Sequence, residues 1–270
     1  MESFLVKLER AREHLQCLEM EAGVWIRTKP YGLADEPDPD PPEDAVPPGA
    51  YRGRIRITRV DDVPDHLSLL IGDCAHNLRS ALDHLALALA RSYIPNMTTE
   101  QANNSAFPIF YSRAMKATEE RERIGCIDST AQTFIKGLQP HLRGNAFRAD
   151  PLWQIHELDR LDKHQVLNLC VGHSEYVGIT KTDDWNIANG GLGLVYLHVT
   201  PGELIADAIF ARYIAMTIDP NREVKMDPTL KPEVAFARGG PAQLEPVIPT
   251  LAGLCDFVRD GLIAPLSKYL

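Results

Sequence analysis

The segment at residues 69–84, LLIGDCAHNLRSALDH, limits the possible folds more than any other part of the sequence. On a helix with roughly 100° per residue, six apolar residues cover one face: Ile71, Cys74, Leu78, Leu82, Leu85 and Leu89. Polar residues form the opposite stripe and its flanks: Asp73, Asn77, Ser80 and His84, with His76 and Asp83 beside them. Burying such groups without partners would cost on the order of 1–3 kcal/mol each. They must therefore pair with one another, meet water in a cleft or serve a function.

A second amphipathic helix is expected at residues 151–169, where Pro151 suits the first turn. Its polar side chains form a basic edge with carboxylates beside it: His156, Arg160 and Lys163, with Asp159 and Asp162. His164 closes the stretch HELDRLDKH, which begins and ends with histidine like HNLRSALDH at residues 76–84. The parallel is too weak to indicate a duplication, but it marks a second polar helix face.

The other helices are predicted from apolar spacing. Residues Phe4, Leu8, Ala11, Leu15, Leu18, Ala22 and Trp25 recur at intervals of four and three, which predicts a helix of about six turns packed lengthwise against others. Further helices are expected at residues 67–93, where Asp65 can act as the cap, and at 113–122 and 129–137. The last is expected at residues 246–270.

Two regions break this helical pattern. Residues 29–50 hold seven prolines among acidic residues, which predicts a solvated loop. Residues 171–240 change to a period near two with NGG, TPG and DPN turns, which predicts antiparallel strands. A further strand at residues 51–60 places Arg52, Arg54 and Arg56 on one face. Those arginines could bind phosphates, or they could form a solvated face neutralised by the acidic loop.

Composition excludes several classes of protein. A net charge of −9 over 270 residues argues against general coating of nucleic acid or anionic membranes. The five cysteines form no CxxC pair, and no apolar run approaches the roughly 18 residues of a membrane span. No GxSxG, P-loop or dinucleotide motif is present. We therefore expect a cytoplasmic protein without a membrane partner.

Three uses of the polar helix faces remain open. His84 could carry a proton while Arg79 stabilises a phosphodiester, because histidine titrates near neutral pH and guanidinium is a fixed donor fork. Asn77 and Asp83 would orient the ligand and the imidazole. The groups could instead form only salt bridges between helices, such as Arg79 to Asp159 or Asp83 to Lys163.

The third use is a metal centre. Its ligands would come from His76, His84, His156 and His164, with Asp73 or Asp159. Against this, His76 and His84 are separated by about 12 Å of helix rise.

Three segments together resemble one bacterial protein family of uncharacterised function. They are GDCAHNLRSALDHLA at residues 72–86, FPIF at 107–110 and LWQIHELDRLDKHQVL at 152–167. That family carries an HNLRSALDHL helix and a later LHELDxxDKH helix. The resemblance implies a common arrangement of elements and brings no activity with it.

The pair Arg79 and His84, separated by four residues, is also similar to the signature of the HEPN superfamily. These are helical, frequently dimeric, metal-independent ribonucleases of toxin and defence systems, with arginine followed after four to six residues by histidine. The resemblance implies that Arg79 and His84 are the catalytic pair, assembled across a homodimer, with RNA as substrate and no cofactor. Ser80 departs from the Asn, Asp or His usual after the arginine.

The sequence therefore predicts an α+β protein of one domain over residues 1–270. A helical bundle with the motif helices at residues 67–170, whose core is HEPN-like by the second resemblance, would be covered by a mostly antiparallel sheet. The expected function is that of a HEPN-like, metal-independent endoribonuclease with an unknown protein partner. The alternatives are a non-catalytic binding or structural protein with salt-bridged helices, and a helical-bundle metal-binding hydrolase.

Overall fold

The structure, a computed structural model, describes residues 2–39, 50–181, 194–199, 202–216 and 226–270. The chain divides into two compact units, each built from separate segments. The helical unit consists of Met1–Glu21, Pro64–Asn168 and Arg238–Leu270, and the strand unit of Ala22–Val63 and Leu169–Ala237. Helices and antiparallel strands together confirm the predicted α+β class.

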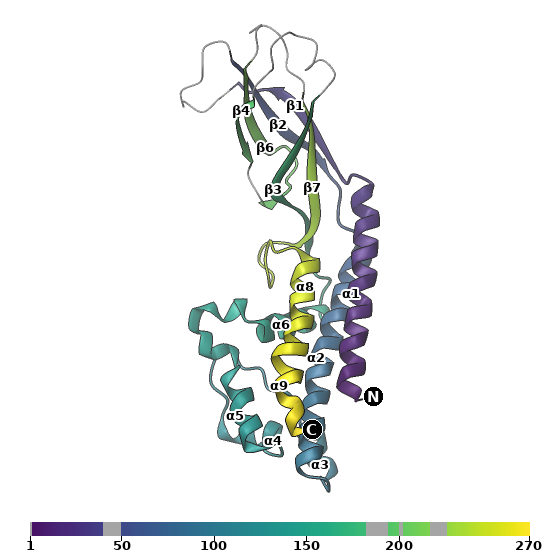
Figure 1. Cartoon of the computed structure of the whole chain (residues 1–270), viewed down its shortest axis with the longest axis vertical. Helices are drawn as coiled ribbons and strands as arrows, with labels where there is room; N and C mark the ends of the chain where they lie inside the picture. The colour runs from purple at the N-terminus through teal and green to yellow at the C-terminus, as the bar shows by residue number, and fades with distance from the viewer. Residues whose placement is uncertain (1, 40–49, 182–193, 200–201, 217–225) are drawn as a thin grey trace. The chain divides into compact units, whose positions relative to one another are not determined.

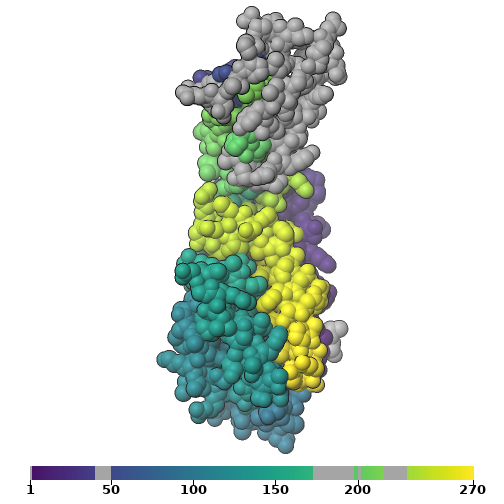
Figure 2. Space-filling model, turned by 60° about the vertical axis from the view of Figure 1, so that its left-hand side comes forward, coloured from purple at the N-terminus to yellow at the C-terminus, as the bar shows by residue number. Residues whose placement is uncertain are grey.

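The helical unit is centred on the long helix α2, Asp65–Tyr93 (Figure 1). It also contains α1 up to Glu21 (the whole helix spans Ser3–Arg27), α3 (Thr99–Asn104), α4 (Ala117–Ile124), α5 (Ser129–Gly137), a 3₁₀ segment (Pro140–Ala149) and α6 (Pro151–Asp162). The C-terminal part follows as α8 (Val247–Asp256), a π-helical stretch (Phe257–Ile263), α9 (Ala264–Leu266) and a last 3₁₀ turn (Ser267–Tyr269). Figure 2 shows this C-terminal part, in yellow, adjoining the middle of the chain, in teal, on one face of the unit.

The apolar faces form the core of the helical unit as predicted. On α2 the six residues of the apolar face are all buried: Ile71, Cys74, Leu78, Leu82, Leu85 and Leu89. On α1 the buried residues of the heptad pattern within this unit are Phe4, Leu8, Ala11 and Leu18. Burial of apolar area at this spacing is what stabilises helices of this length, so the polar stripe of α2 is left to face other elements or water.

The strand unit contains two antiparallel sheets. One has the strand order β1 (Tyr31–Pro37), β2 (Ala50–Val60), β6 (Ile209–Met216) and β4 (Leu194–Val199). The other has the order β5 (Gly202–Glu203), β3 (Leu169–Lys181) and β7 (Met226–Phe236). The buried core of the strand unit combines side chains of both sheets, including Ile55, Val171 and Phe210. The change to a period near two therefore predicted the strands correctly.

The loop predicted at residues 29–50 is wrong in its first half. Tyr31–Pro37 is the strand β1, which pairs antiparallel with β2 so that Glu36 lies opposite Arg54. Prolines and acidic residues disfavour a strand locally, but β2 supplies hydrogen-bond partners and positive charge. The rest of that prediction, residues 40–49, lies outside the described residues.

Other helix boundaries also differ from the prediction. Helix α6 ends at Asp162 rather than at residue 169, because the chain turns back to α2, where the Leu167 N–H donates to Ser68 Oγ at 2.8 Å. The first residue of α2 follows the cap Pro64, so Asp65 is in the first turn and is not the cap. Helix α3, for which no helix was predicted, opens with a capping box of Thr98 and Gln101.

Candidate functional site

Arg79 is held on α2 by a compact set of hydrogen bonds. Its Nη2 donates to Asp83 Oδ1 at 2.7 Å and to the Phe107 carbonyl at 2.8 Å. The same Asp83 oxygen accepts from the Phe107 N–H at 3.0 Å. Arg79 and Asp83 stand four residues apart and so share a helix face. Together they fix the backbone of the segment that begins at Phe107 against α2.

The second guanidinium nitrogen of Arg79 is different. Only 15% of the side chain is exposed, and the buried Nη1 has no hydrogen-bond partner in the described part of the chain. Burial lowers the pKa of Arg79, while the charges of Asp83 and Asp159 act in the opposite direction. Since guanidinium has a very high intrinsic pKa, it stays protonated. Buried donors in folded proteins almost always have a hydrogen-bond acceptor. The described part of the chain leaves the Nη1 donor of Arg79 unsatisfied.

His84 lies on another side of α2. It lies five positions after Arg79, which is about 140° around the helix, and its imidazole is half-buried. Across the described residues His84 makes no hydrogen bond or ion pair, with Arg79 or with any other side chain. Within one chain, therefore, the structure does not bring the predicted catalytic pair together.

His156 on α6 is the imidazole that Arg79 influences. Burial lowers the pKa of His156, and the positive charge of Arg79 is the second cause. The Tyr111 ring lies 6.1 Å from the imidazole, centroid to centroid, at a tilt of 42°. A histidine with a lowered pKa is neutral at pH 7 and can accept a proton.

Asp159 connects α2 with α6. Its side chain is 7% exposed, and its two oxygens contact His76 Nδ1 at 2.9 Å and Lys163 Nζ at 2.6 Å. The predicted pairs of Arg79 with Asp159 and of Asp83 with Lys163 are therefore wrong in their partners. The arginine and the lysine each bond the carboxylate four residues away in their own helix, where the backbone already holds the two side chains close.

Asp162 fits closely against α2 at Gly72. A Cβ atom at Gly72 would lie 1.8 Å from Asp162 Oδ1, so only glycine allows this approach. Burial raises the pKa of Asp162, and the charges of Asp73 and Asp159 raise it further. The carboxylates between α2 and α6 thus lie near one another.

The remaining predicted residues are dispersed. Asp73 is exposed, with Oδ2 3.8 Å from His14 Nδ1, and its carbonyl accepts from Asn77 Nδ2 at 2.8 Å. Ser80 is half-buried, Arg160 is bonded to Glu157 at 2.6 Å, and His164 is exposed beyond the end of α6. The structure assigns these side chains to the surface or to local bonds.

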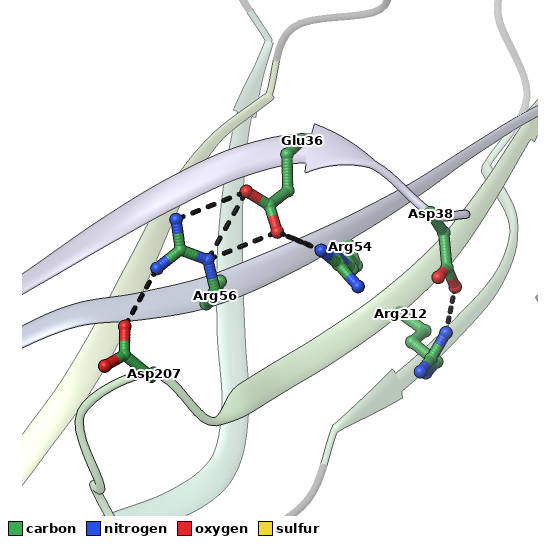
Figure 3. Close-up of polar contacts among 6 residues, drawn as sticks. All are labelled: Glu36, Asp38, Arg54, Arg56, Asp207 and Arg212. Atoms are coloured by element: carbon green, nitrogen blue, oxygen red, sulfur yellow. Dashed lines mark hydrogen bonds and ion pairs between the residues drawn. The ribbon is translucent and has the colours of Figure 1, made fainter. Parts of the chain in front are cut away.

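The arginine face of β2 is largely neutralised (Figure 3). Glu36 of β1 lies between Arg54 and Arg56, at 2.6 Å from Arg54 Nη2 and 3.2 Å from Arg56 Nε. Arg56 Nη1 also contacts Asp207 at 3.1 Å. Hydrogen bonds from Arg56 and Arg54 lower the pKa of Glu36. Two of the three phosphate-binding candidates are thus already paired.

The third candidate, Arg52, is half-buried and makes no ion pair among the residues described. The neighbouring cation on β6, Arg212, is paired with Asp38 (Figure 3). Two of the acidic partners, Glu36 and Asp38, come from β1 and the residue after it, which the sequence showed only as a solvated loop, and the third, Asp207, precedes β6. The arginine row therefore fits the neutralised-face interpretation.

The structure also shows an aromatic cluster that the sequence patterns did not indicate. Tyr111, Phe147 and Trp153 come from three separate segments and meet beside His156. Their only sequence signal is aromatic content near the motif helix, since no periodicity links them.

Among the described residues no three His, Cys, Asp or Glu side chains gather in a way that could hold a metal ion. No helix in the described ranges has the length and apolarity needed to cross a membrane. Compared with known proteins, the chain matches no family model, no curated protein and no solved structure.

Proposed function

We propose that this chain is a HEPN-like, metal-independent endoribonuclease that holds the scissile phosphate of RNA at Arg79. The observation that carries the proposal is the buried Nη1 of Arg79, a charged donor with no acceptor in the described part of the chain. A phosphate oxygen is the acceptor that a guanidinium bonds best. Because few water molecules reach this nitrogen, such a bond would stabilise the charge that develops on phosphorus.

The proposed reaction needs no metal. The RNA 2′-hydroxyl attacks phosphorus, a base removes its proton, and an acid protonates the leaving 5′-oxygen, which yields a 2′,3′-cyclic phosphate and a free 5′-hydroxyl. His84 is assigned one of the two proton transfers. Because His84 and Arg79 face different sides of α2, the proposal includes a homodimer in which a second copy brings His84 to Arg79. The five thiols are free, which is compatible with the cytoplasm as the compartment.

The test is cleavage of mixed RNA with and without EDTA. Wild type is compared with Arg79→Ala, His84→Ala and a matched control, Arg91→Ala, which removes an exposed arginine from the same helix. We expect chelator-resistant cleavage by wild type and by the control. The other two variants should be slower by about 100-fold or more. Equal cleavage by all four preparations would indicate a contaminating nuclease and contradict the proposal.

A second candidate is a non-catalytic role for the polar helix faces. It is favoured by Asp83, which accepts from Arg79 Nη2 and the Phe107 N–H at once, and by Asp159, which joins α2 to α6. If it is correct, folded wild type cleaves no RNA, while replacement of Asp83 lowers stability. Measuring unfolding alongside cleavage separates the two candidates.

A further inference from the structure

Four rings of the helical unit form a continuous aromatic cluster. Tyr111 stacks on Phe147 with ring centroids 5.6 Å apart and an angle of 18° between planes. Trp153 meets Phe147 edge-on at 5.6 Å, and His156 lies 6.1 Å from Tyr111. Trp153 is 7% exposed, whereas Tyr111 and Phe147 are half-buried. The indole of Trp153 therefore forms the buried side of the cluster, and the rings of Tyr111 and Phe147 reach the surface.

One arginine lies over a ring of the cluster, and a second lies over the nearby ring of Phe110. The Arg148 guanidinium lies over the Phe147 ring, 5.5 Å from its centroid, and Arg148 has no ion-pair partner among the residues described. Arg113 stands over Phe110 at 5.2 Å but is paired with Glu119 at 2.5 Å. The Arg148 guanidinium is therefore an exposed, planar positive charge next to an aromatic ring.

A short segment of the chain links the cluster to Arg79. Arg79 Nη2 donates to the Phe107 carbonyl at 2.8 Å, and Tyr111 follows four residues later, with its ring 6.1 Å from that of His156. An RNA strand with a phosphate at Arg79 would therefore have neighbouring nucleotides on the side of Tyr111. The aromatic surface and the buried donor thus lie at the two ends of residues 107–111 in the helical unit.

We propose that Tyr111, Phe147 and Arg148 form a stacking surface for the bases of single-stranded RNA next to Arg79. The proposal rests on the proposed function for the choice of RNA, and it names the form of RNA that this site takes. Aromatic rings and guanidinium planes stack on any exposed base face. In a duplex those faces are already covered by neighbouring base pairs, so the surface selects single strands.

The number of cations available for phosphate predicts that RNA affinity falls only slowly as the salt concentration rises. Arg113 and Arg160 are already bonded to glutamates, so the proposal assigns phosphate contacts to two donors, Arg148 and the Nη1 of Arg79. Two neutralised phosphates on a single strand give a slope of about −1.4 for log K against log salt concentration. A binder that relies mainly on phosphates would show a much steeper slope.

Binding is measured by fluorescence anisotropy with a labelled ten-nucleotide RNA carrying 2′-O-methyl groups, which cannot form the attacking 2′-alkoxide. The full chain is tested in EDTA as wild type, Tyr111→Ala, Tyr111→Phe and Arg148→Gln. The matched control is Tyr93→Ala, which removes a 55% exposed tyrosine from α2. Thermal unfolding of each variant establishes that it is folded.

We expect Tyr111→Ala to raise the Kd about 10- to 100-fold, the cost of one lost base stack. Tyr111→Phe keeps the ring and should stay within about twofold of wild type, as should Tyr93→Ala. Arg148→Gln removes one cation from the surface and should reduce the salt slope by about 0.7. A matching duplex should bind at least about tenfold more weakly than the single strand.

The proposal is overturned if wild type does not bind the single strand or binds the duplex equally well. It is also overturned if folded Tyr111→Ala or, should that variant not fold, the surface variant Arg148→Gln binds like wild type in affinity and salt slope. Failure of the ribonuclease proposal looks different. In that case the 2′-O-methyl strand still binds through Tyr111, while unmodified RNA is not cleaved or Arg79→Ala does not slow its cleavage.

Discussion

Asp83 satisfies two donors at once, and this makes it the residue on which the Arg79 region depends most. Its Oδ1 accepts from Arg79 Nη2 and from the N–H of the buried Phe107. Replacing it by alanine leaves the Phe107 N–H without an acceptor, at a cost of about 1–3 kcal/mol, while Arg79 Nη2 keeps its bond to the Phe107 carbonyl. Arg79→Met should lose less stability, because it also removes Nη1, the buried donor without an acceptor.

We therefore expect Asp83→Ala to lower the free energy of unfolding by about 2 kcal/mol, and by more than Arg79→Met. Urea denaturation of the two variants and wild type measures the difference. If Arg79→Met is the more destabilising variant, the carboxylate does not hold the segment at Phe107 as described. Water that reaches the partly exposed Asp83 position keeps the expected loss within the range for one unsatisfied group.

His156 should make stability depend on pH. Its pKa in the folded state is lowered, chiefly by burial and then by Arg79, so the unfolded chain binds a proton first as the pH falls. Stability from a neutral His156 is complete above its unfolded pKa of about 6.5 and declines as the pH falls below that value. We expect His156→Gln to flatten the decline below about pH 6.5 in denaturation experiments. Gln165→Ala, at an exposed position that does not titrate, should leave it unchanged, and equal slopes for all three proteins would contradict the assignment.

At the scale of elements, the approach of α6 to α2 depends on Gly72. A Cβ there would meet Asp162 at 1.8 Å, so Gly72→Ala must displace the carboxylate, at about 1–3 kcal/mol for overpacking. In an Asp162→Ala background the obstacle is gone, and the same substitution should stabilise the protein by about 0.5–1 kcal/mol through helix propensity. Chemical denaturation of the four proteins tests this change of sign, and destabilisation in both backgrounds would show that another neighbour blocks the position.

Local periodicity predicted the helices well and their partners poorly. Helix α5 has the predicted bounds, and α2 begins two residues before the predicted start, because apolar spacing and turn residues are local signals. Strand β1 was missed because its stability comes from β2, including the Glu36 bonds to Arg54 and Arg56. The polar stripe of α2 was also recognised from spacing, yet spacing could not determine which carboxylate each cation bonds, since that depends on how the helices pack.

At the scale of the whole molecule, the change of hydrophobic period predicted the α+β class correctly. It did not indicate that each unit is assembled from segments far apart in the sequence, or that the boundary in the first helix falls after Glu21. Discontinuous units arise from contacts between distant segments, and those contacts leave no periodic signal. Whether residues 1–270 behave as the one predicted domain therefore depends on whether the two units unfold together, and experiment can test this.

Separate cores predict separate unfolding of the two units. Leu82 is fully buried in the helical unit and Ile55 in the strand unit, and truncation of such residues to alanine typically costs about 2–5 kcal/mol. Leu82→Ala should speed hydrogen exchange in α2, α6 and α8 and leave β2 and β6 unchanged, because a cavity weakens the cooperative unit that contains it. Ile55→Ala should do the reverse. Mass spectrometry of peptides from both units measures the exchange. If either substitution speeds exchange equally in all these elements, the chain unfolds as one cooperative domain.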